Sequence, residues 1–218
     1  MQPTITIEGF GTAAVGTIYG IGRNYADHAK ELGNQVPVGE PVVFLKAPSS
    51  VRALAGGSLA FATESIHHEA ELVLRIGQNI PLGTKNPGWA AIDAIGLGLD
   101  LTRREKQNDL KTKGLPWTLA KSFTGSSVLS PMIKTSECAG QEHFKFKFAI
   151  DGKTLQEGDT RQMIFDVPTL LTFLASFNTL LTGDLIFTGT PAGVGPMKRG
   201  DRFTLELMEP HRRWDGVL

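Results

Sequence analysis

The pattern of apolar and polar positions along the chain predicts many short strands and few helices. Residues 144–150 alternate apolar with polar side chains, which is the two-residue period of a strand with one buried face. Asp151-Gly152 follows directly and predicts a type I′ hairpin turn into a returning strand. Short apolar runs at 41–46 and 95–102 indicate buried strands. The pattern therefore favours a mainly β protein.

Three segments have the features of helices. Residues 26–32 and 102–113 are each followed by a glycine, a common residue just after a helix C-terminus. A third helix begins after Asp166, whose side chain is the expected N-cap. Residues 1–15 and 210–218 are expected to be peripheral. Because no linker or repeat divides the chain, all 218 residues are predicted to form a single domain.

The composition is typical of a globular protein without a strong electrostatic field. Its 22 basic and 22 acidic side chains balance, so charge gives no reason to expect nucleic acid or a membrane as a partner. No apolar run is long enough to span a bilayer, and the N-terminus lacks a signal-peptide pattern. The single cysteine, Cys138, excludes an intrachain disulfide and fits a reducing compartment. A cytoplasmic protein is therefore expected.

One predicted strand, at about 65–76, carries two acidic side chains where a strand usually carries apolar or uncharged ones. Glu69 and Glu71 are two residues apart, so both point to the same face. Like charges side by side repel unless a cation lies between them, and a divalent metal ion is the simplest such cation. Asp100, at the end of another apolar strand, would complete three hard oxygen ligands. Such a set favours Mg²⁺, Mn²⁺ or Ca²⁺ over zinc.

Histidines occur both beside these acids and earlier in the chain. His67 points to the same face of the strand as the two glutamates and is expected next to the metal ligands. His68 points to the opposite face and is expected to have a structural role. His28 and Glu31 lie three residues apart on the first predicted helix, so they share one face. The pair is either a general base oriented by a carboxylate or a solvated surface pair. The spacing alone leaves both interpretations open.

The charged helix at 102–113 divides into two groups of polar side chains. Arg104 and Gln107 share a face that can point back toward Asp100. The other charged residues of this helix, Lys111 among them, are expected to be solvated.

Two later residues are also candidates for binding an anion. Lys121 is the one lysine of the mostly apolar stretch 115–123, where a cation is costly without an anionic partner. Thr190 belongs to a glycine-rich loop, 188–196, that lacks the pattern of a P-loop or a dinucleotide-binding loop. Such a loop can present backbone N–H groups and a hydroxyl to an anion, or it can be a sharp connection.

Six stretches, in the same order along the chain, resemble the fumarylacetoacetate hydrolase (FAH) family, most closely its short acylpyruvate hydrolase and oxaloacetate decarboxylase branch. They are GRNYADH at 22–28, PVVFLK at 41–46, HHEAEL at 67–72, LDLT at 99–102, GLPWTLAKSF at 114–123 and TGTPAGVGP at 188–196. The resemblance implies an α+β fold, a β-roll of mixed sheets with few helices, and a homodimer. The segment 209–214 does not resemble the family's closing strand.

The resemblance also implies a role for each candidate residue. One Mg²⁺ or Mn²⁺ ion per chain would be bound by Glu69, Glu71 and Asp100. His28 with Glu31 would activate water on a short helix that orders over the substrate. Substrate would be contacted by Arg23, Arg104, Gln107 and Thr190, and Lys121 would act on the developing charge.

The activity that the resemblance implies is hydrolysis of a C–C bond in short 2,4-dioxo acids (acylpyruvates). Attack of water would release a pyruvate enolate, whose charge is stabilised where it forms. Decarboxylation of oxaloacetate, and tautomerisation or isomerisation of dioxo acids, need the same arrangement of charge and stay open as alternatives. A catalytically inactive metal-binding protein is a more distant alternative.

Overall fold

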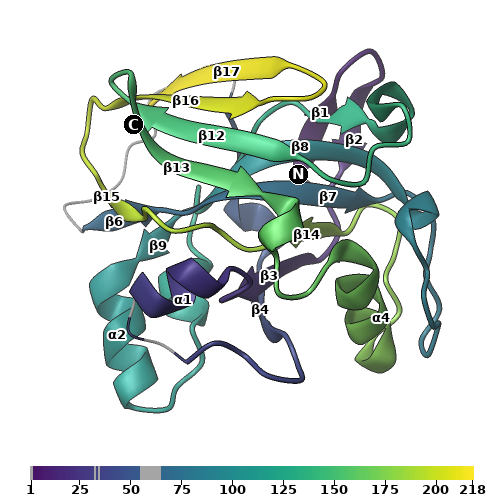
Figure 1. Cartoon of the computed structure of the whole chain (residues 1–218), viewed down its shortest axis with the longest axis horizontal. Helices are drawn as coiled ribbons and strands as arrows, with labels where there is room; N and C mark the ends of the chain where they lie inside the picture. Colours follow the sequence, from purple (N-terminus) through teal and green to yellow (C-terminus); the bar gives the residue numbers. More distant parts are fainter. Residues whose placement is uncertain (1, 32, 34, 55–64) are drawn as a thin grey trace.

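The computed structural model describes residues 2–31, 33, 35–54 and 65–218, and it is built mainly of strands (Figure 1). The largest sheet is mixed and curled, and its eight strands include β7 and β8, which pair antiparallel at its centre. The strands in order across this sheet are β4 (Val42–Lys46), β3 (Ile18–Gly22), β14 (Leu185–Phe187), β7 (Ala70–Ile76), β8 (Ile92–Asp100), β10 (Ser127–Leu129) and β5 (Val51–Ala53), with β11 (Ile133–Lys134) also pairing with β8.

Three smaller sheets complete the β structure of the described residues. The first is a hairpin of β1 (Thr4–Ile7) and β2 (Gly11–Ala14). The second has four strands, in the order β13 (Lys153–Asp159), β12 (Lys145–Ile150), β16 (Arg202–Leu207) and β17 (Arg212–Val217). The third has three strands, in the order β15 (Gly195–Met197), β6 (Ile66–His68) and β9 (Thr102–Arg103). The α-helices found in the described ranges are α1 (Ala26–Glu31), α2 (Arg104–Thr112), α3 (Thr118–Lys121) and α4 (Val167–Phe177). The predicted α+β class, a mixed β-roll with few short helices, is confirmed.

The main core lies between the large sheet and the four-stranded sheet (Figure 1). Phe148 of β12 and Phe203 of β16 are buried and belong to the same apolar cluster as Leu72 and Leu97 of the central strands. Burial of side chains of this size stabilises the fold by roughly 1.5–3 kcal/mol each. None of the described helices is both long and apolar enough to cross a bilayer.

Two local predictions from the sequence are confirmed. Asp151 and Gly152 have φ angles of 48° and 79°, which is the left-handed geometry of a type I′ turn joining β12 to β13. The Asp166 side chain accepts a hydrogen bond from the backbone N–H of Thr169 at 3.0 Å, so it caps α4 as expected.

The C-terminal segment forms a strand, β17, that the sequence pattern did not predict. β17 pairs with β16 along its whole length, with Trp214 opposite Leu205, and Leu218 is buried. The segment has charged residues at 212, 213 and 215 around Trp214, and its apolar Val217 and Leu218 are adjacent, so it lacks the alternation of a strand. Its position depends on backbone pairing with a neighbouring strand, which side-chain periodicity does not reveal.

A glycine on β8 fixes how closely the sheet can pack beside the acidic residues. A β-carbon added at Gly98 would lie 2.8 Å from the carbonyl oxygen of Val128 and 2.9 Å from the ring of Phe187. We expect Gly98→Ala to lower the free energy of unfolding by about 2 kcal/mol because the core is overpacked. Denaturant unfolding measures it, with Gly195→Ala as control, since its β-carbon meets only His68 at 3.4 Å. Equal stability of both variants would contradict this packing.

Candidate active site

Three acidic side chains meet where the central strands end. Glu71 lies on β7, Asp100 is the last residue of β8, and the backbone N–H of Asp100 donates to the carbonyl of Glu69 at 2.8 Å. Ligand atoms of Glu69, Glu71 and Asp100 all lie within 4.8 Å of one another, and all three residues are buried. We call these residues the carboxylate cluster. The structure thus brings together the three residues that the sequence nominated as metal ligands.

The strand predicted at 65–76 is interrupted at Glu69. β6 ends at His68 and pairs with β9 and β15, whereas β7 starts at Ala70 and joins the large sheet. The break has a physical basis, because a single strand cannot pair in two separate sheets without a change of direction between them. Glu69 therefore sits at the junction of two sheets, where its carboxylate still reaches the side of Glu71.

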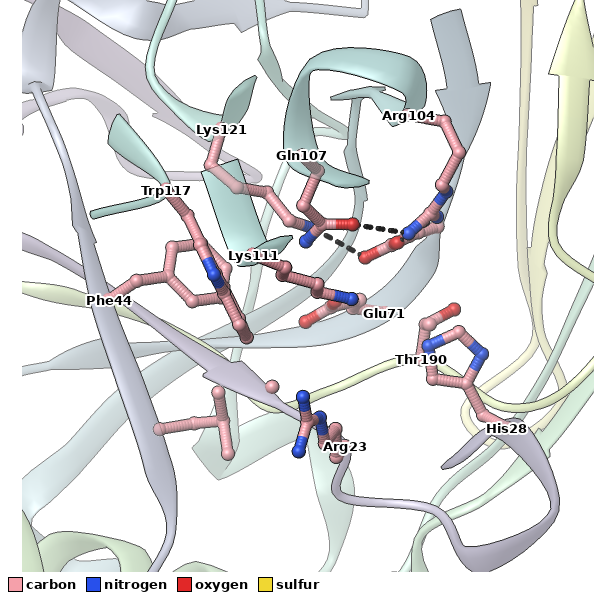
Figure 2. A pocket seen from close by; sticks show the side chains of 13 residues that line it. Arg23, His28, Phe44, Glu71, Arg104, Gln107, Lys111, Trp117, Lys121 and Thr190 are labelled. Carbon is pink, nitrogen blue, oxygen red and sulfur yellow. Dashed lines mark hydrogen bonds and ion pairs between the residues drawn. The ribbon is translucent and has the colours of Figure 1, made fainter. Parts of the chain in front are cut away.

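Basic side chains from three separate elements neutralise the carboxylate cluster. The Lys121 ammonium of α3 donates to Glu69 Oε2 at 2.6 Å and also to the second oxygen of Asp100. Lys46, the last residue of β4, donates to Asp100 Oδ1 at 2.5 Å, and Arg104 of α2 pairs with Glu69. Figure 2 shows Arg104 and Lys121 pointing into the same pocket. Glu69 and Asp100 therefore each have a cationic partner, which burial of a charge requires.

Lys46 is a site residue that the sequence reasoning missed. Its side chain is fully buried, and it donates a second hydrogen bond, to the carbonyl of Ser126 at 2.9 Å. The available signal was the same as for Lys121, namely a lysine at the end of an apolar run. Burial lowers the pKa of Lys46, and the adjacent Asp100 opposes that shift.

The pKa values of the two glutamates of the cluster are shifted in opposite directions. Burial alone would raise the pKa of Glu69, but the charges of Lys121 and Arg104 hold it below its usual value. The pKa of Glu71 is raised well above its usual value by burial and by the neighbouring charges of Asp100 and Glu69. Glu71 accepts a hydrogen bond from the backbone N–H of Gly189 at 2.7 Å.

The carboxylate cluster suits a divalent cation. Glu71 forms no ion pair with any described residue, so it is the acid with negative charge still to be compensated. The donor set consists of carboxylate oxygens alone, which are the ligands that Mg²⁺ and Mn²⁺ prefer. Glu69, Glu71 and Asp100 are the residues that would hold the ion. Its identity stays a prediction.

The His28–Glu31 pair of α1 stands at the edge of the same pocket. His28 Nδ1 lies 3.5 Å from Glu31 Oε2, and His28 is buried while Glu31 is partly exposed. Burial lowers the pKa of His28, which favours the neutral imidazole. Glu31 also accepts from the backbone N–H of Gly193 at 3.1 Å, so the loop 188–196 holds the carboxylate beside the ring. His28 Nδ1 forms no hydrogen bond with a described residue in this arrangement, but a neutral imidazole beside a carboxylate can serve as a general base.

Every predicted catalytic or substrate-contacting residue except Glu31 lines the pocket. Gln107 accepts from Arg104 at 2.6 Å, and this pair forms one wall (Figure 2). The Thr190 hydroxyl donates to the carbonyl of Ala70 at 2.8 Å. The thirteen lining residues are Ile21, Gly22, Arg23, His28, Phe44, Glu69, Glu71, Arg104, Gln107, Lys111, Trp117, Lys121 and Thr190.

Two further expectations concern residues around the cluster. His68 is buried and its Nδ1 lies 2.9 Å from Gln156 Oε1, in agreement with a structural role, while His67 is half-buried with an unpartnered Nδ1. Burial and Arg104 lower the pKa of His67 to about 4.

The expectation that Lys111 is a solvated helix residue is wrong, because its side chain lines the pocket and is about half-buried. The last turn of α2 directs it inward.

Comparison with known proteins identifies relatives along nearly the whole chain. The family model described as "Fumarylacetoacetate (FAA) hydrolase C-terminal" matches residues 17–213. The oxaloacetate tautomerase FAHD1, mitochondrial, of Arabidopsis thaliana is 44% identical over 84% of this chain and 82% of its own length. The mitochondrial oxaloacetate decarboxylase of Dictyostelium discoideum is 43% identical over 84% of each chain.

A solved structure has the same architecture. Fumarylpyruvate hydrolase from Pseudomonas aeruginosa, in complex with Mn²⁺ and pyruvate, superposes with a TM-score of 0.92 at 31% identity, covering 99% of this chain and 95% of that one. The sequence relatives named above are described as mitochondrial, so the cytoplasmic location expected for this chain stays a prediction.

Replacement of Lys46 tests the charge compensation. Lys46→Met keeps a side chain of similar length but leaves Asp100 with Lys121 alone, so we expect the free energy of unfolding to fall by about 3 kcal/mol. The control, Lys147→Met, removes a surface pair with Glu157 at 3.1 Å and should cost less than about 1 kcal/mol. Denaturant unfolding compares them. Equal effects would show that Lys46 does not compensate the cluster.

Metal addition tests the donor set. Mg²⁺ or Mn²⁺ at a hundredfold excess over its dissociation constant should stabilise the fold by about 2.7 kcal/mol, because only the folded chain assembles the cluster. Thermal unfolding with metal and with chelator measures the shift. Glu71→Gln should lose most of it, whereas Glu157→Gln, an exposed carboxylate on β13, should keep it. If Glu71→Gln were stabilised as strongly as the unaltered chain, the ion would bind elsewhere.

Proposed function

Because the chain belongs to the fumarylacetoacetate hydrolase family, we propose that it is a metal-dependent enzyme that interconverts the keto and enol forms of oxaloacetate or a similar 2-oxo acid. The observation that carries this proposal is the carboxylate cluster, with a buried ammonium between two of its members and a histidine–glutamate pair at the same pocket. The relatives described as oxaloacetate tautomerases support the substrate class. Acylpyruvate hydrolysis, the activity first expected, has less support.

His28 is the proposed proton carrier. Burial keeps its imidazole neutral, so it can accept the proton from C3 of the 2-oxo acid. Glu31 orients the ring and stabilises the imidazolium that results. Return of the proton to the enolate oxygen at C2 gives the enol, and return to C3 gives the keto form again.

The positive side chains of the pocket stabilise the charge that develops on the oxygen at C2. A divalent ion, when bound, acts as a Lewis acid toward the 2-oxo group. Lys121 lies between Glu69 and Asp100, and these two acids raise the pKa of Lys121 even though burial opposes the charged form. Its ammonium stays charged and in place, so it stabilises the enolate without reorganisation. Arg104 and Gln107 are placed to hold the substrate carboxylate.

Acylpyruvate hydrolysis is a second candidate activity. The same His28–Glu31 pair could deprotonate a water molecule that attacks the distal carbonyl, and the leaving group would again be a pyruvate enolate. The similarity to a fumarylpyruvate hydrolase solved with Mn²⁺ and pyruvate supports this alternative. Decarboxylation of oxaloacetate also produces that enolate but requires no base.

Replacement of His28, the proposed base, should affect tautomerisation and hydrolysis differently from decarboxylation. His28→Ala should lower oxaloacetate tautomerisation and acetylpyruvate hydrolysis by about 100-fold or more, because both need a proton acceptor. Oxaloacetate decarboxylation should fall by about tenfold at most, since its carbanion forms by loss of CO₂. Assays of the three reactions with purified protein and Mg²⁺ measure the split. A uniform loss of all three would overturn the role of His28.

A loss of the metal site should abolish all three reactions together. Glu69→Gln removes a ligand charge from the cluster, and chelator removes the ion, so both should leave no metal-dependent turnover. Strong stabilisation by Mg²⁺ without turnover of any 2-oxo acid would instead support an inactive metal-binding protein.

A further inference from the structure

Two basic side chains face the pocket, and no acid in the described ranges pairs with either of them. Arg23, which follows β3, and Lys111, on the last turn of α2, both line the cavity, and Figure 2 shows them reaching into it from opposite sides. Each lies near the ring of Trp117, with Lys111 Nζ 5.2 Å and Arg23 Cζ 6.0 Å from its centroid. Within the described residues, neither one forms an ion pair. The aromatic ring therefore holds two cations whose charge is not neutralised.

The backbone of Arg23 has an unusual conformation. Its φ is 59°, in the left-handed region where glycine and asparagine are common and a long side chain is not. Such a conformation costs on the order of 1 kcal/mol. Its Nε is also buried without a hydrogen-bond partner. A strained residue with an unsatisfied donor at a pocket wall is typical of a position kept for a ligand.

Lys111 is held in a positively charged environment. Burial, together with Arg104 and Arg23, lowers the pKa of Lys111 to about 8. An anion between Lys111 and Arg23 would relieve this repulsion. The pocket contains Glu69 and Glu71, but neither of these acids pairs with the two cations, so, for the parts of the chain that the structure describes, a bound anion is left to provide the partner.

A count of charges indicates what this anion is. The three acids of the carboxylate cluster are equalled in number by Lys46, Lys121 and Arg104, which pair with Glu69 and Asp100. A bound divalent ion adds two positive charges, which one substrate carboxylate and one enolate oxygen would balance. Arg23 and Lys111 then remain for a second negative group on the substrate.

We propose that Arg23 and Lys111 bind a second carboxylate of the substrate, so that the site selects 2-oxo acids with two carboxylates over those with one. This inference rests on the proposed function, because it assigns the other end of the same substrate. The guanidinium can donate two hydrogen bonds to a carboxylate, and the ammonium supplies a further charge. The two residues thus determine specificity, while the chemistry stays at the carboxylate cluster.

Two matched acids test the proposal without turnover. 2-Oxoglutarate and 2-oxopentanoate have the same chain length and differ in the terminal carboxylate, and neither is a β-dicarbonyl compound. Calorimetry with the Mg²⁺-loaded protein gives the ratio of their dissociation constants. We expect the unaltered chain to prefer the dicarboxylate by about tenfold or more, and Lys111→Met to reduce that preference by about tenfold, the effect of one lost charge-assisted hydrogen bond.

Control variants separate recognition from general damage. Lys113→Met lies two residues further along, and its ammonium pairs with Asp109 at 2.7 Å, so the preference should be unchanged. Arg23→Asn suits the left-handed backbone, so the midpoint of thermal unfolding should not fall while the preference does. Equal weakening of both acids in Lys111→Met, or an unchanged preference, would overturn the proposal.

The same experiment keeps the two proposals apart. Binding preference is measured without a reaction, so a dicarboxylate preference that depends on Lys111 would support the subsite even if oxaloacetate were not turned over. Metal-dependent turnover of oxaloacetate with no such preference would instead support the proposed function and overturn the subsite.

Discussion

The placement of three buried carboxylates within 4.8 Å of one another is the constraint on which the rest of the structure depends. Such a group is unstable unless cations reach it, since each unpaired buried charge costs several kcal/mol. Lys46 from β4, Lys121 from α3 and Arg104 from α2 supply those cations. The edge of the large sheet and two helices are therefore fixed around the carboxylate cluster, and the pocket is the space that they enclose (Figure 2).

This compensation also explains how one site could serve several related reactions. Lys46, Lys121 and Arg104 compensate Glu69 and Asp100, so part of the charge of a bound metal ion would remain available for the substrate. Tautomerisation, decarboxylation and acyl hydrolysis all pass through an enolate, and the same positive groups stabilise it in each case. What differs is the use of His28 and the length and charge of the far end of the substrate. Arg23 and Lys111 line the same pocket, where we propose that they bind that far end.

Much of the site was predictable because its key residues obey local periodicities. The two-residue period of a strand predicted that Glu69 lies beside Glu71, and the two acids do meet even though the strand breaks between β6 and β7. The spacing of three residues on a helix likewise predicted that the side chains of His28 and Glu31 lie together. Lys46 was missed because its partner, Asp100, is 54 residues away and sheet order is not visible in the sequence. The same holds for strand β17, whose position depends on long-range pairing, and for Lys111, which turns inward only because α2 packs over the pocket.

Formation of an enolate at the carboxylate cluster is the central claim, and deuterium exchange tests it most directly. Pyruvate can be neither decarboxylated nor hydrolysed by these routes, but its C3 protons exchange with D₂O whenever an enolate forms. Nuclear magnetic resonance of pyruvate in D₂O should show exchange that requires both the protein and Mg²⁺ or Mn²⁺ and that is lost with chelator. Exchange no faster than with the metal ion alone would contradict the account.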